Sequence, residues 1–443
     1  MLMAACGNGL TPESAPPVPT VLPGATEPQP APESGLGRCE DVTGTVEFRW
    51  WGGDARQEMQ LRALDRFREL YPGIQVNPQP VGFGGYWDQL QVEAVAGNTP
   101  DVFTSNEGWI ASLVAGGMLA DLTQQPTMDL SHFSADALGA AVGPGGAVYA
   151  IPTGGNAQAM FANLDILEAA GVPVPDDQTW TWEDFHNISQ QVSEANITNA
   201  SGAQIWGNAG LSAQGPARVW ANQTDGGMFT PDGQLNWSQD SMEGLLALQA
   251  DMVASGAAPS GTIQTEDGNA SAQDTLMGQG QVAFWSQWSN LLPAVAAGSP
   301  DANFALLRFP GDHTSPHMGT WLNPSQFFAQ SATAQSPEAA ACLINFMVNN
   351  ADAAEIMGID RGVPFNPNML AVVEPTLDER NAMVAEFMGR IAYDAAASTP
   401  LPELSEDLNH FTIASSDSVL FGLATPAAAA ATMHSDLAAA IVQ

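Results

Sequence analysis

The chain has 443 residues, 45% of them hydrophobic, which is too long for one core and predicts two lobes and a tail. Acidic side chains dominate its charge: 48 Asp and Glu face 11 basic residues, all of them Arg, for a formal net charge of -37 at pH 7. This charge excludes nucleic acid and anionic lipid surfaces as partners. Adaptation to high salt and a biased genomic composition explain the acidity and the lack of Lys equally well.

A localisation signal lies in the N-terminal residues. Residues 1–6 end in Leu2–Cys6, which resembles the remnant of a bacterial lipobox, where small residues precede a Cys that receives lipid. Met3 stands where Leu is usual, and the positive and apolar regions of a signal peptide are missing, as a start site assigned too late would explain. Residues 7–43 are rich in Pro, Glu and Ser and predict a disordered, extended linker. We therefore expect lipid on Cys6 and anchoring to the outer face of a bacterial cytoplasmic membrane, with an incidental Cys in a disordered terminus as the alternative.

Strands and helices alternate in the next part of the chain, from residue 44 to residue 122. In order, the predicted elements are a strand over Thr45–Trp51, a helix that ends at Tyr71–Gly73, a strand over Ile74–Val76, a helix over Trp87–Ala96 and a strand over Pro100–Phe103. This alternation predicts a parallel sheet flanked by helices, and such sheets bind ligands beyond the carboxyl ends of their strands. No run of about twenty apolar residues is present, so no membrane span is expected.

The rest of the chain continues the α/β pattern. Further strands are predicted over Val148–Pro152, Ala159–Asn163, Trp206–Gly210, Gly280–Ser286, Phe304–Arg308 and Ser325–Ala329. Further helices are predicted over Leu164–Ala170, Leu245–Val253, Ser336–Asn349 and Leu420–Val442. Another helix begins after Thr181, whose hydroxyl and Asp184 are spaced as a capping box, and Pro337 suits a first helical position. Pro426 is expected to break the closing helix.

Two cysteines and two histidines raise a covalent and a metal alternative. Cys39 and Cys342 are free to form a disulfide in an exported protein, but a buried and unpaired Cys342 is favoured. His313 and His317 flank Pro316, which breaks any helix that would align them, so solvent exposure is favoured over a metal site. No zinc-type spacing of Cys and His occurs, and neither a metal nor another cofactor is expected.

Several short motifs follow one another in a fixed order from Gly44 to the C-terminus. They are Pro100–Phe103, Gly117–Leu122, Tyr149–Pro152, Asn163, Gly171–Pro173, Gly280–Phe284 and Gly362–Pro364. The ordered set resembles extracellular solute-binding protein family 1, the carbohydrate-capturing subunits of ABC importers. The resemblance implies an α/β fold of two lobes, each a mostly parallel sheet flanked by helices, joined by crossing strands around a sugar-binding cleft. It places lobe 1 at residues 44–152 plus about 320–362, and lobe 2 at residues 153–319 plus about 363–443.

The resemblance also implies a set of ligand-binding residues. Carried over position by position, the family's contacts fall on Trp51, Gly53, Asp54, Asn106, Glu107, Trp109, Asn156, Trp288, Thr320, Trp321 and Arg361. A sugar ring presents an apolar C–H face and a belt of hydroxyl groups, so it needs flat aromatic surface and side chains that donate and accept hydrogen bonds. The chain has 12 Trp and only 4 Tyr, so indole rings are the expected platforms.

Structural roles compete with these assignments. Trp50 alternates with Trp51 along its strand and is expected in the core, as are Trp180 and Trp182 at the start of a helix. The carboxylates of Asp54 and Glu107 also suit solvated loops or helix ends. Arg361 suits a buried pair with a carboxylate as well as a sugar contact.

The function expected from these features is that of a monomeric, extracytoplasmic substrate-binding component of an ABC importer. It would capture a mono- or oligosaccharide between its lobes and deliver it to membrane permease subunits that work with a cytoplasmic ATPase. Neither catalytic residues nor enzymatic activity is expected. The alternatives are a secreted glycoside hydrolase, with Asp54 and Glu107 as its carboxylate pair, and a carbohydrate-adhesion module.

Overall fold

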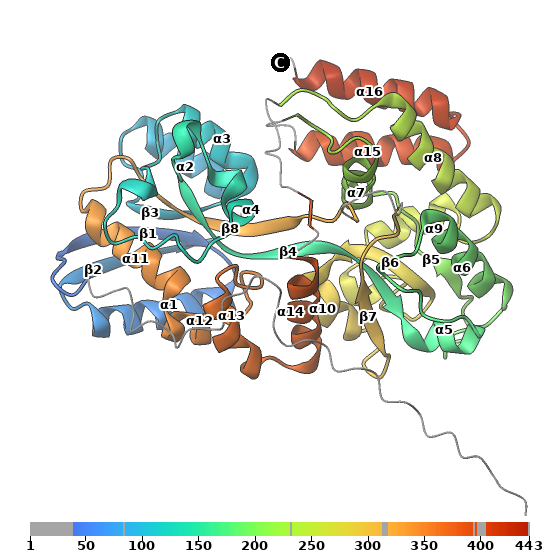
Figure 1. The fold of residues 1–443 in the computed structure, drawn as a ribbon, viewed down its shortest axis with the longest axis horizontal. Helices are drawn as coiled ribbons and strands as arrows, with labels where there is room; N and C mark the ends of the chain where they lie inside the picture. The colour runs from blue at the N-terminus through green and yellow to red at the C-terminus, as the bar shows by residue number, and fades with distance from the viewer. Residues whose placement is uncertain are drawn as a thin grey trace, which may run out of the picture. The chain divides into compact units, whose positions relative to one another are not determined.

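The computed structural model describes residues 39–82, 85–230, 233–311, 318–392, 395–396 and 405–441. Cys6, His313 and His317 lie outside these residues, so the predictions for them stay predictions. The strands within the described ranges are β1 (Gly44–Trp51), β2 (Ile74–Val81), β3 (Val102–Ser105), β4 (Ala150–Asn163), β5 (Trp206–Asn208), β6 (Val282–Trp288), β7 (Phe304–Leu307) and β8 (Leu322–Gln330). They form one sheet in the order β2-β1-β3-β8-β4-β6-β5, and β7 pairs with β4 off this path (Figure 1).

The strand directions divide the sheet into two groups. In the first half, β1 is parallel to both β2 and β3, and β8 is antiparallel to β3. In the second half, β5 is parallel to β6, and both β6 and β7 are antiparallel to β4. Each half is therefore parallel apart from one strand, β8 in the first and β4 in the second. This confirms the predicted α/β class and the predicted crossing strands.

Strand β4 connects the two halves. Its first part, residues 150–157, pairs with β8, and residues 158–163 lie between β6 and β7. The sequence pattern predicted two short strands here, because Gly154 and Gly155 interrupt the apolar run. The structure instead has one strand of 14 residues with register shifts at these glycines. A Cβ on Gly154 would lie 2.6 Å from the carbonyl oxygen of Gly362, so glycine permits the late loop to approach β4 this closely.

Helices cover both halves of the sheet (Figure 1). In the first half these are α1 (Asp54–Leu70), α2 (Tyr86–Val95), α3 (Glu107–Ala115), α4 (Ala135–Leu138), α11 (Pro337–Asn349), α12 (Ala351–Met357) and α13 (Pro367–Val373). In the second half they are α5 (Leu164–Ala170), α6 (Trp182–Glu194), α7 (Gln214–Thr224), α8 (Gln239–Ala254), α9 (Gly261–Gly268), α10 (Leu292–Ala296), α14 (Glu379–Ile391), α15 (Ser405–Leu420) and α16 (Pro426–Ile441). The last two pack against α8.

Local sequence signals set several helix boundaries. The hydroxyl of Thr181 accepts a hydrogen bond from the backbone N–H of Asp184, and the Asp184 carboxylate accepts one from the N–H of Thr181. This confirms the predicted capping box at the start of α6. Pro337 is the first residue of α11, as predicted, and Pro426 begins α16 where the closing helix was expected to break.

The hydrophobic cores follow the two halves of the sheet. One cluster joins Phe48, Trp50 and Phe67 to residues of α11, and another joins Trp180, Phe185 and Phe284 to residues of α8 and α16. Trp50 is fully buried and Trp180 is 3% exposed, so both predictions of a core role are confirmed. Trp182 is half-buried and packs against the second of these clusters. The predicted lobe boundaries stay predictions.

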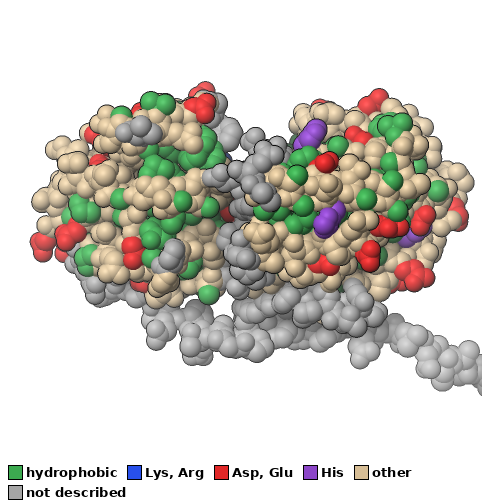
Figure 2. All heavy atoms as spheres, turned by 90° about the horizontal axis from the view of Figure 1, so that it is seen from above, with side chains coloured by type: hydrophobic (Ala, Val, Ile, Leu, Met, Phe, Trp, Pro, Cys, Tyr) green, Lys and Arg blue, Asp and Glu red, His purple; other side chains and the backbone are tan. Residues whose placement is uncertain are grey.

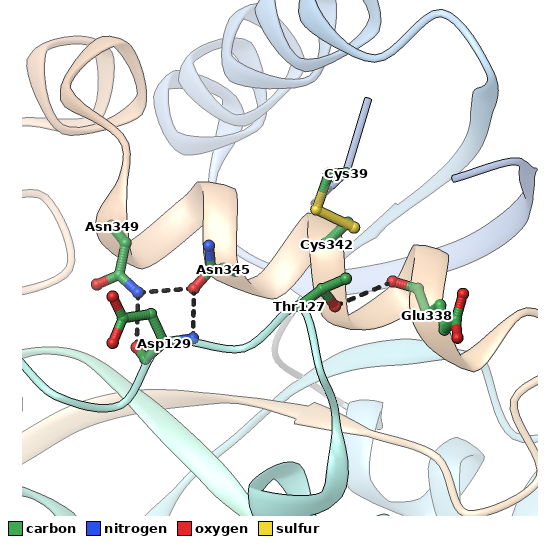
Figure 3. The surroundings of a disulfide bond; sticks show 7 residues. All are labelled: Cys39, Thr127, Asp129, Glu338, Cys342, Asn345 and Asn349. Carbon is green, nitrogen blue, oxygen red and sulfur yellow. Dashed lines mark hydrogen bonds between the residues drawn. A yellow bond between two sulfur atoms is a disulfide. The ribbon is translucent and has the colours of Figure 1, made fainter. Parts of the chain in front are cut away.

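Cys39 and Cys342 form a disulfide, so the preference for an unpaired Cys342 was wrong (Figure 3). The two residues are 303 positions apart, and only the packing of α11 beside the chain that precedes β1 brings their Cα atoms to 5.9 Å. The same helix holds the segment before α4: Asn345 Oδ1 accepts from the backbone N–H of Asp129 at 2.9 Å, and Asn349 Nδ2 donates to the Asp129 carbonyl at 2.8 Å. The disulfide therefore fastens the late helix α11 to the beginning of the folded chain.

None of the helices in the described part of the chain has the length and apolar character that crossing a bilayer requires.

Candidate ligand-binding site

A cavity of about 900 Å³ lies where the N-terminus of α3 faces elements of the second half. The first half contributes residues 106–108 to its wall, and the second half contributes residues 209–218, 264–275 and 285–288. Trp321 and residues 323–325, at the start of β8, also line the cavity, as do Gln158, Leu291, and Asn409 and Ile413 of α15. This volume suits a ligand of several rings, since small-molecule sites in proteins usually enclose roughly 300–1,000 Å³.

Two indole rings and a guanidinium group form one wall of the cavity. The rings of Trp288 and Trp321 meet edge to face, with centroids 5.5 Å apart and an interplanar angle of 81°. The guanidinium carbon of Arg218 lies 4.2 Å from the centroid of the Trp321 ring. Because Trp321 is only 2% exposed and carries Arg218 on its ring, it serves as a support for the cation, while half-buried Trp288 offers more aromatic surface to the cavity.

Arg218 is the cationic side chain of this wall, and it comes from α7. Burial lowers the pKa of its guanidinium, because a charged group loses hydration, and the negative charge of Glu107 acts in the opposite direction. Glu107 is the first residue of α3, on the opposite side of the cavity. An electrostatic attraction therefore spans the cavity between the two halves of the molecule.

The N-terminus of α3 presents polar groups to the cavity. Asn106 is the N-cap residue, and its side-chain oxygen accepts from the backbone N–H of Trp109 at 3.1 Å. Glu107 follows in the first turn, where the helix dipole favours a negative charge. The cap is thus Asn106, and the carboxylate of Glu107 remains on the cavity wall.

Gln158 on β4 adds a buried amide to the cavity. Its side chain is 3% exposed, and its Oε1 atom has no hydrogen-bond partner among the described residues. Gly215 of α7 makes room for this side chain, because a Cβ at that position would lie 2.4 Å from Gln158 Cδ. Gln158 lies directly opposite Trp288 in the pairing of β4 with β6. The cavity therefore contains an acceptor that a ligand donor can satisfy.

Asp267 is the other acidic residue in the lining. Its carboxylate accepts from the backbone N–H of Leu276 at 2.5 Å. Burial raises its pKa to about 6, because desolvation disfavours the ionised form more than this hydrogen bond stabilises it.

Four of the predicted site residues line the cavity, namely Asn106, Glu107, Trp288 and Trp321. The structure thus brings together Asn106 and Glu107 of the first half, Trp288 of the second half, and Trp321, which directly precedes β8. Their role as ligand contacts stays a prediction.

Four others, Trp51, Gly53, Asp54 and Trp109, lie in the first half outside that lining. Trp51 is 7% exposed and packs against Tyr86, with ring centroids 4.8 Å apart. Trp109 stacks on Trp87, with centroids 4.5 Å apart and planes 13° from parallel. Gly53 is the N-cap residue of α1, and Asp54 is an exposed acid in its first turn.

The remaining three, Asn156, Thr320 and Arg361, lie at the crossing strands. Asn156 Oδ1 and Thr320 Oγ1 are buried without a hydrogen-bond partner among the described residues. Arg361 is 5% exposed and donates to the side-chain oxygens of Gln326 and Gln60. Within the described part of the chain, the side-chain hydrogen bonds of Arg361 thus go to two amides and not to a carboxylate. Burial, and to a smaller extent the nearby charge of Arg56, lower the pKa of Arg361 to about 9, although the charge of Asp360 acts in the opposite direction.

Gln158, Arg218 and Asp267 were not predicted from the sequence. Arg218 carried the best available signal, since the chain has only 11 Arg and this one follows the helix-starting pair Gly215-Pro216. Gln158 and Asp267 had no such signal, because their positions in the wall depend on how β4 and α9 meet α7. Among the residues that the structure describes, no group of three or more His, Cys, Asp or Glu side chains is arranged to hold a metal ion.

The family model described as "Bacterial extracellular solute-binding protein" matches residues 62–383, which is more than half of the chain. The chain therefore belongs to the bacterial extracellular solute-binding proteins, a family of binding proteins that act outside the cytoplasm. This confirms the resemblance and the extracytoplasmic location that were inferred from the motifs.

Solved structures show the same fold. An extracellular solute-binding protein family 1 member from Alicyclobacillus acidocaldarius subsp. acidocaldarius DSM 446 superposes with a TM-score of 0.78 at 21% identity, covering 91% of this chain and 99% of that one. A periplasmic oligogalacturonide-binding protein from Yersinia enterocolitica gives a TM-score of 0.75 at 18% identity, covering 90% and 99%.

A curated relative matches over part of the sequence. The arabinooligosaccharide-binding protein of Bacillus subtilis (strain 168) is 24% identical over 217 residues, which is 48% of this chain and 48% of that protein. The match therefore spans about half the length of that relative.

Proposed function

We propose that this protein is the extracytoplasmic substrate-binding component of an ABC importer, that it captures a mono- or oligosaccharide in the cavity described above, and that it delivers the sugar to a permease. The observation that carries the proposal is a cavity of about 900 Å³ walled by both halves of a solute-binding fold. Two relatives whose names specify oligosaccharides, the arabinooligosaccharide- and oligogalacturonide-binding proteins, support a carbohydrate ligand.

The chemistry of the wall also supports a sugar. Trp288 supplies an aromatic surface for the C–H face of a ring, and Gln158, Asn106, Asn323 and Ser286 supply neutral hydrogen-bonding groups. Hydrogen bonds from both walls to one ligand would favour closure of the halves around it. Reversing a 99:1 preference for an open form requires roughly 5.5 kcal/mol of differential affinity, which several bonds of about 0.5–1.5 kcal/mol each and an aromatic contact supply together.

The hydrolase alternative has less support. A glycosidase requires two carboxylates facing one substrate, and of the suggested pair only Glu107 lines the cavity. Asp54 lies at the exposed start of α1. Attachment of lipid at Cys6, and hence anchoring to the outer face of the cytoplasmic membrane, remains part of the proposal and is tested by metabolic labelling with a lipid precursor.

A thermal-shift screen against a panel of mono- and oligosaccharides tests the proposed function. A sugar that binds only the folded protein at a concentration of 100 times its Kd stabilises the protein by about 2.7 kcal/mol and raises the melting midpoint. Product analysis of the same mixtures distinguishes a receptor from a hydrolase, since a receptor returns the sugar intact. A panel in which no sugar raises the midpoint would contradict the proposal.

A further inference from the structure

Few charged side chains line the cavity in the described part of the chain, and negative ones outnumber positive ones. Among the described residues of its lining, Arg218 is positive and Glu107 and Asp267 are negative. The whole chain carries a formal charge of -37 and contains 11 Arg, so one of its few cations is placed in this wall. A cation in a cavity wall could bind an anionic sugar or could interact with a negative side chain of the protein itself.

The orientation of Arg218 is fixed by its neighbours. Its guanidinium carbon lies 4.2 Å from the centroid of the Trp321 ring, and Trp321 in turn packs against Trp288 in an edge-to-face contact. A planar guanidinium that is supported on one face keeps its N–H donors at its rim. Arg218 is 3% exposed, so its position on the indole is set by packing.

Glu107 provides the opposing charge from the other side of the cavity. It lines the same cavity from the first turn of α3, and its charge attracts that of Arg218. A ligand carboxylate near Arg218 would therefore have to displace this attraction and would meet the charge of Glu107. Asp267, in the same lining, adds a further repulsion whenever it is ionised.

Gln158 gives an independent argument for the same ligand chemistry. Among the residues that the structure describes, no donor reaches its buried Oε1 atom, which can only accept a hydrogen bond. A sugar hydroxyl both donates and accepts, so it can donate to the Oε1 atom of Gln158. An ionised carboxylate only accepts and would leave the Gln158 acceptor unsatisfied.

We propose that Glu107 and Arg218 act together as a charge filter that makes the cavity selective for uncharged sugars over uronic-acid sugars, with Gln158 as a hydroxyl-binding residue. This inference rests on the proposed function, since it specifies the ligand class of the same cavity. Glu107 is the specificity determinant, because its negative charge attracts Arg218 and repels the carboxylate of an acidic sugar in the same cavity.

Isothermal titration calorimetry with paired ligands tests the filter. Neutral oligosaccharides are compared with the uronic-acid oligosaccharides of the same linkage, beginning with galactobiose and digalacturonate. The wild-type protein is expected to bind at least one neutral sugar, and to bind the acidic partner of that sugar at least about tenfold more weakly. Because each comparison is a ratio measured on one protein, it does not depend on the fraction of active molecules.

Three substitutions with matched controls identify the residues. Glu107→Gln is expected to raise the affinity for the acidic sugar and so to reduce the ratio of the neutral-sugar affinity to the acidic-sugar affinity. Glu183→Gln, in the first turn of α6, is expected to leave this ratio unchanged. Gln158→Leu is expected to weaken the binding of the neutral sugar about tenfold, and Gln249→Leu is expected to leave that affinity unchanged. Gln249 is the matched control because it is also buried with an unpartnered Oε1 atom but lies outside the cavity lining. Arg218→Gln is compared with Arg380→Gln, a cation over Phe304 outside the lining.

The outcomes separate the two proposals. Tighter binding of the acidic member in the wild type, or an unchanged ratio in Glu107→Gln, would overturn the charge filter and leave the receptor function intact. Failure of every neutral and acidic sugar to bind would contradict the proposed function itself.

Discussion

The two walls of the cavity are built differently. The first half contributes a helix N-terminus, Asn106 to Gly108, while its aromatic residues Trp51, Tyr86, Trp87 and Trp109 pack on one another. The second half contributes the supported cation Arg218, the amide of Gln158 and the indole of Trp288. The first half therefore supplies a polar helix end to the cavity, and the second half supplies the aromatic, amide and cationic groups to which the proposed function assigns ligand contact.

The surface outside the cavity is acidic, as the composition predicts. Figure 2 shows acidic side chains spread over both coloured parts of the face in view, together with scattered hydrophobic patches. The cation in the cavity wall is thus set apart from a surface that repels anions at a distance. This agrees with a ligand that carries no charge.

The largest expected effect concerns the stability of the first half. Replacing both Cys39 and Cys342 by Ala should lower the free energy of unfolding by about 2–5 kcal/mol, because the unfolded chain is then no longer cross-linked. Denaturant unfolding measures this loss. Sugar affinity should change less than about twofold, since neither residue lines the cavity. A loss of sugar affinity without a loss of stability would contradict a purely structural role for this disulfide.

The next effect concerns ligand binding by the second half. Trp288→Ala should weaken sugar binding about a hundredfold, or roughly 2.7 kcal/mol, because the ring is the exposed part of the aromatic wall. Titration calorimetry measures the loss. Trp206→Ala is the control, since Trp206 is also a half-buried strand residue but lies outside the cavity lining. A large drop in melting temperature with affinity intact would instead place Trp288 in a structural role.

Asn106 concerns both stability and ligand binding, because it caps α3 and also lines the cavity. Asn106→Ala should cost about 1 kcal/mol of stability, because the N–H of Trp109 loses its capping acceptor at the start of α3. Asn106→Asp keeps a capping oxygen and should restore that stability. If Asn106 also contacts sugar, calorimetry will show that the restored variant still binds more weakly than the wild type.

The smallest effect concerns pH. The pKa of Asp267 is raised from 3.8 to about 6 in the folded protein, so its protonated form favours folding below 3.8 and this contribution is lost as the pH rises through 6. Asp267→Asn should therefore be more stable than the wild type at neutral pH, by about 1 kcal/mol after allowance for partial exposure, and the difference should shrink as the pH falls below 6. Thermal melts across this range measure it, with Asp301→Asn as an exposed control; a difference that grows on acidification would contradict the assignment.

Local signals allowed much of the fold to be predicted. The alternation of elements from β1 to β3 depends on apolar periodicity and on glycines at the strand ends, and the start of α6 depends on Thr181 and Asp184. Helix α15 was missed because its buried face includes Thr412 and Ser416, so the apolar pattern that marks a packed helix is weak. The Cys39–Cys342 bridge was missed because it joins residues 303 positions apart.

The site was predictable only in part, because it too depends on contacts between residues that are far apart in the sequence. Motif positions led to Asn106, Glu107, Trp288 and Trp321, which the structure places around one cavity. Gln158 and Arg218 lie in the same wall because Gly215 permits α7 to pack closely on the Gln158 side chain of β4, and no local sequence pattern indicates that contact.

Sugar capture by this protein is tested most directly by a calorimetric titration of the wild type with a panel of neutral oligosaccharides and their uronic-acid partners. We expect saturable binding of a neutral sugar at one site per chain and weaker binding of its acidic partner. Absence of saturable binding to every sugar, with the protein folded, would contradict sugar capture.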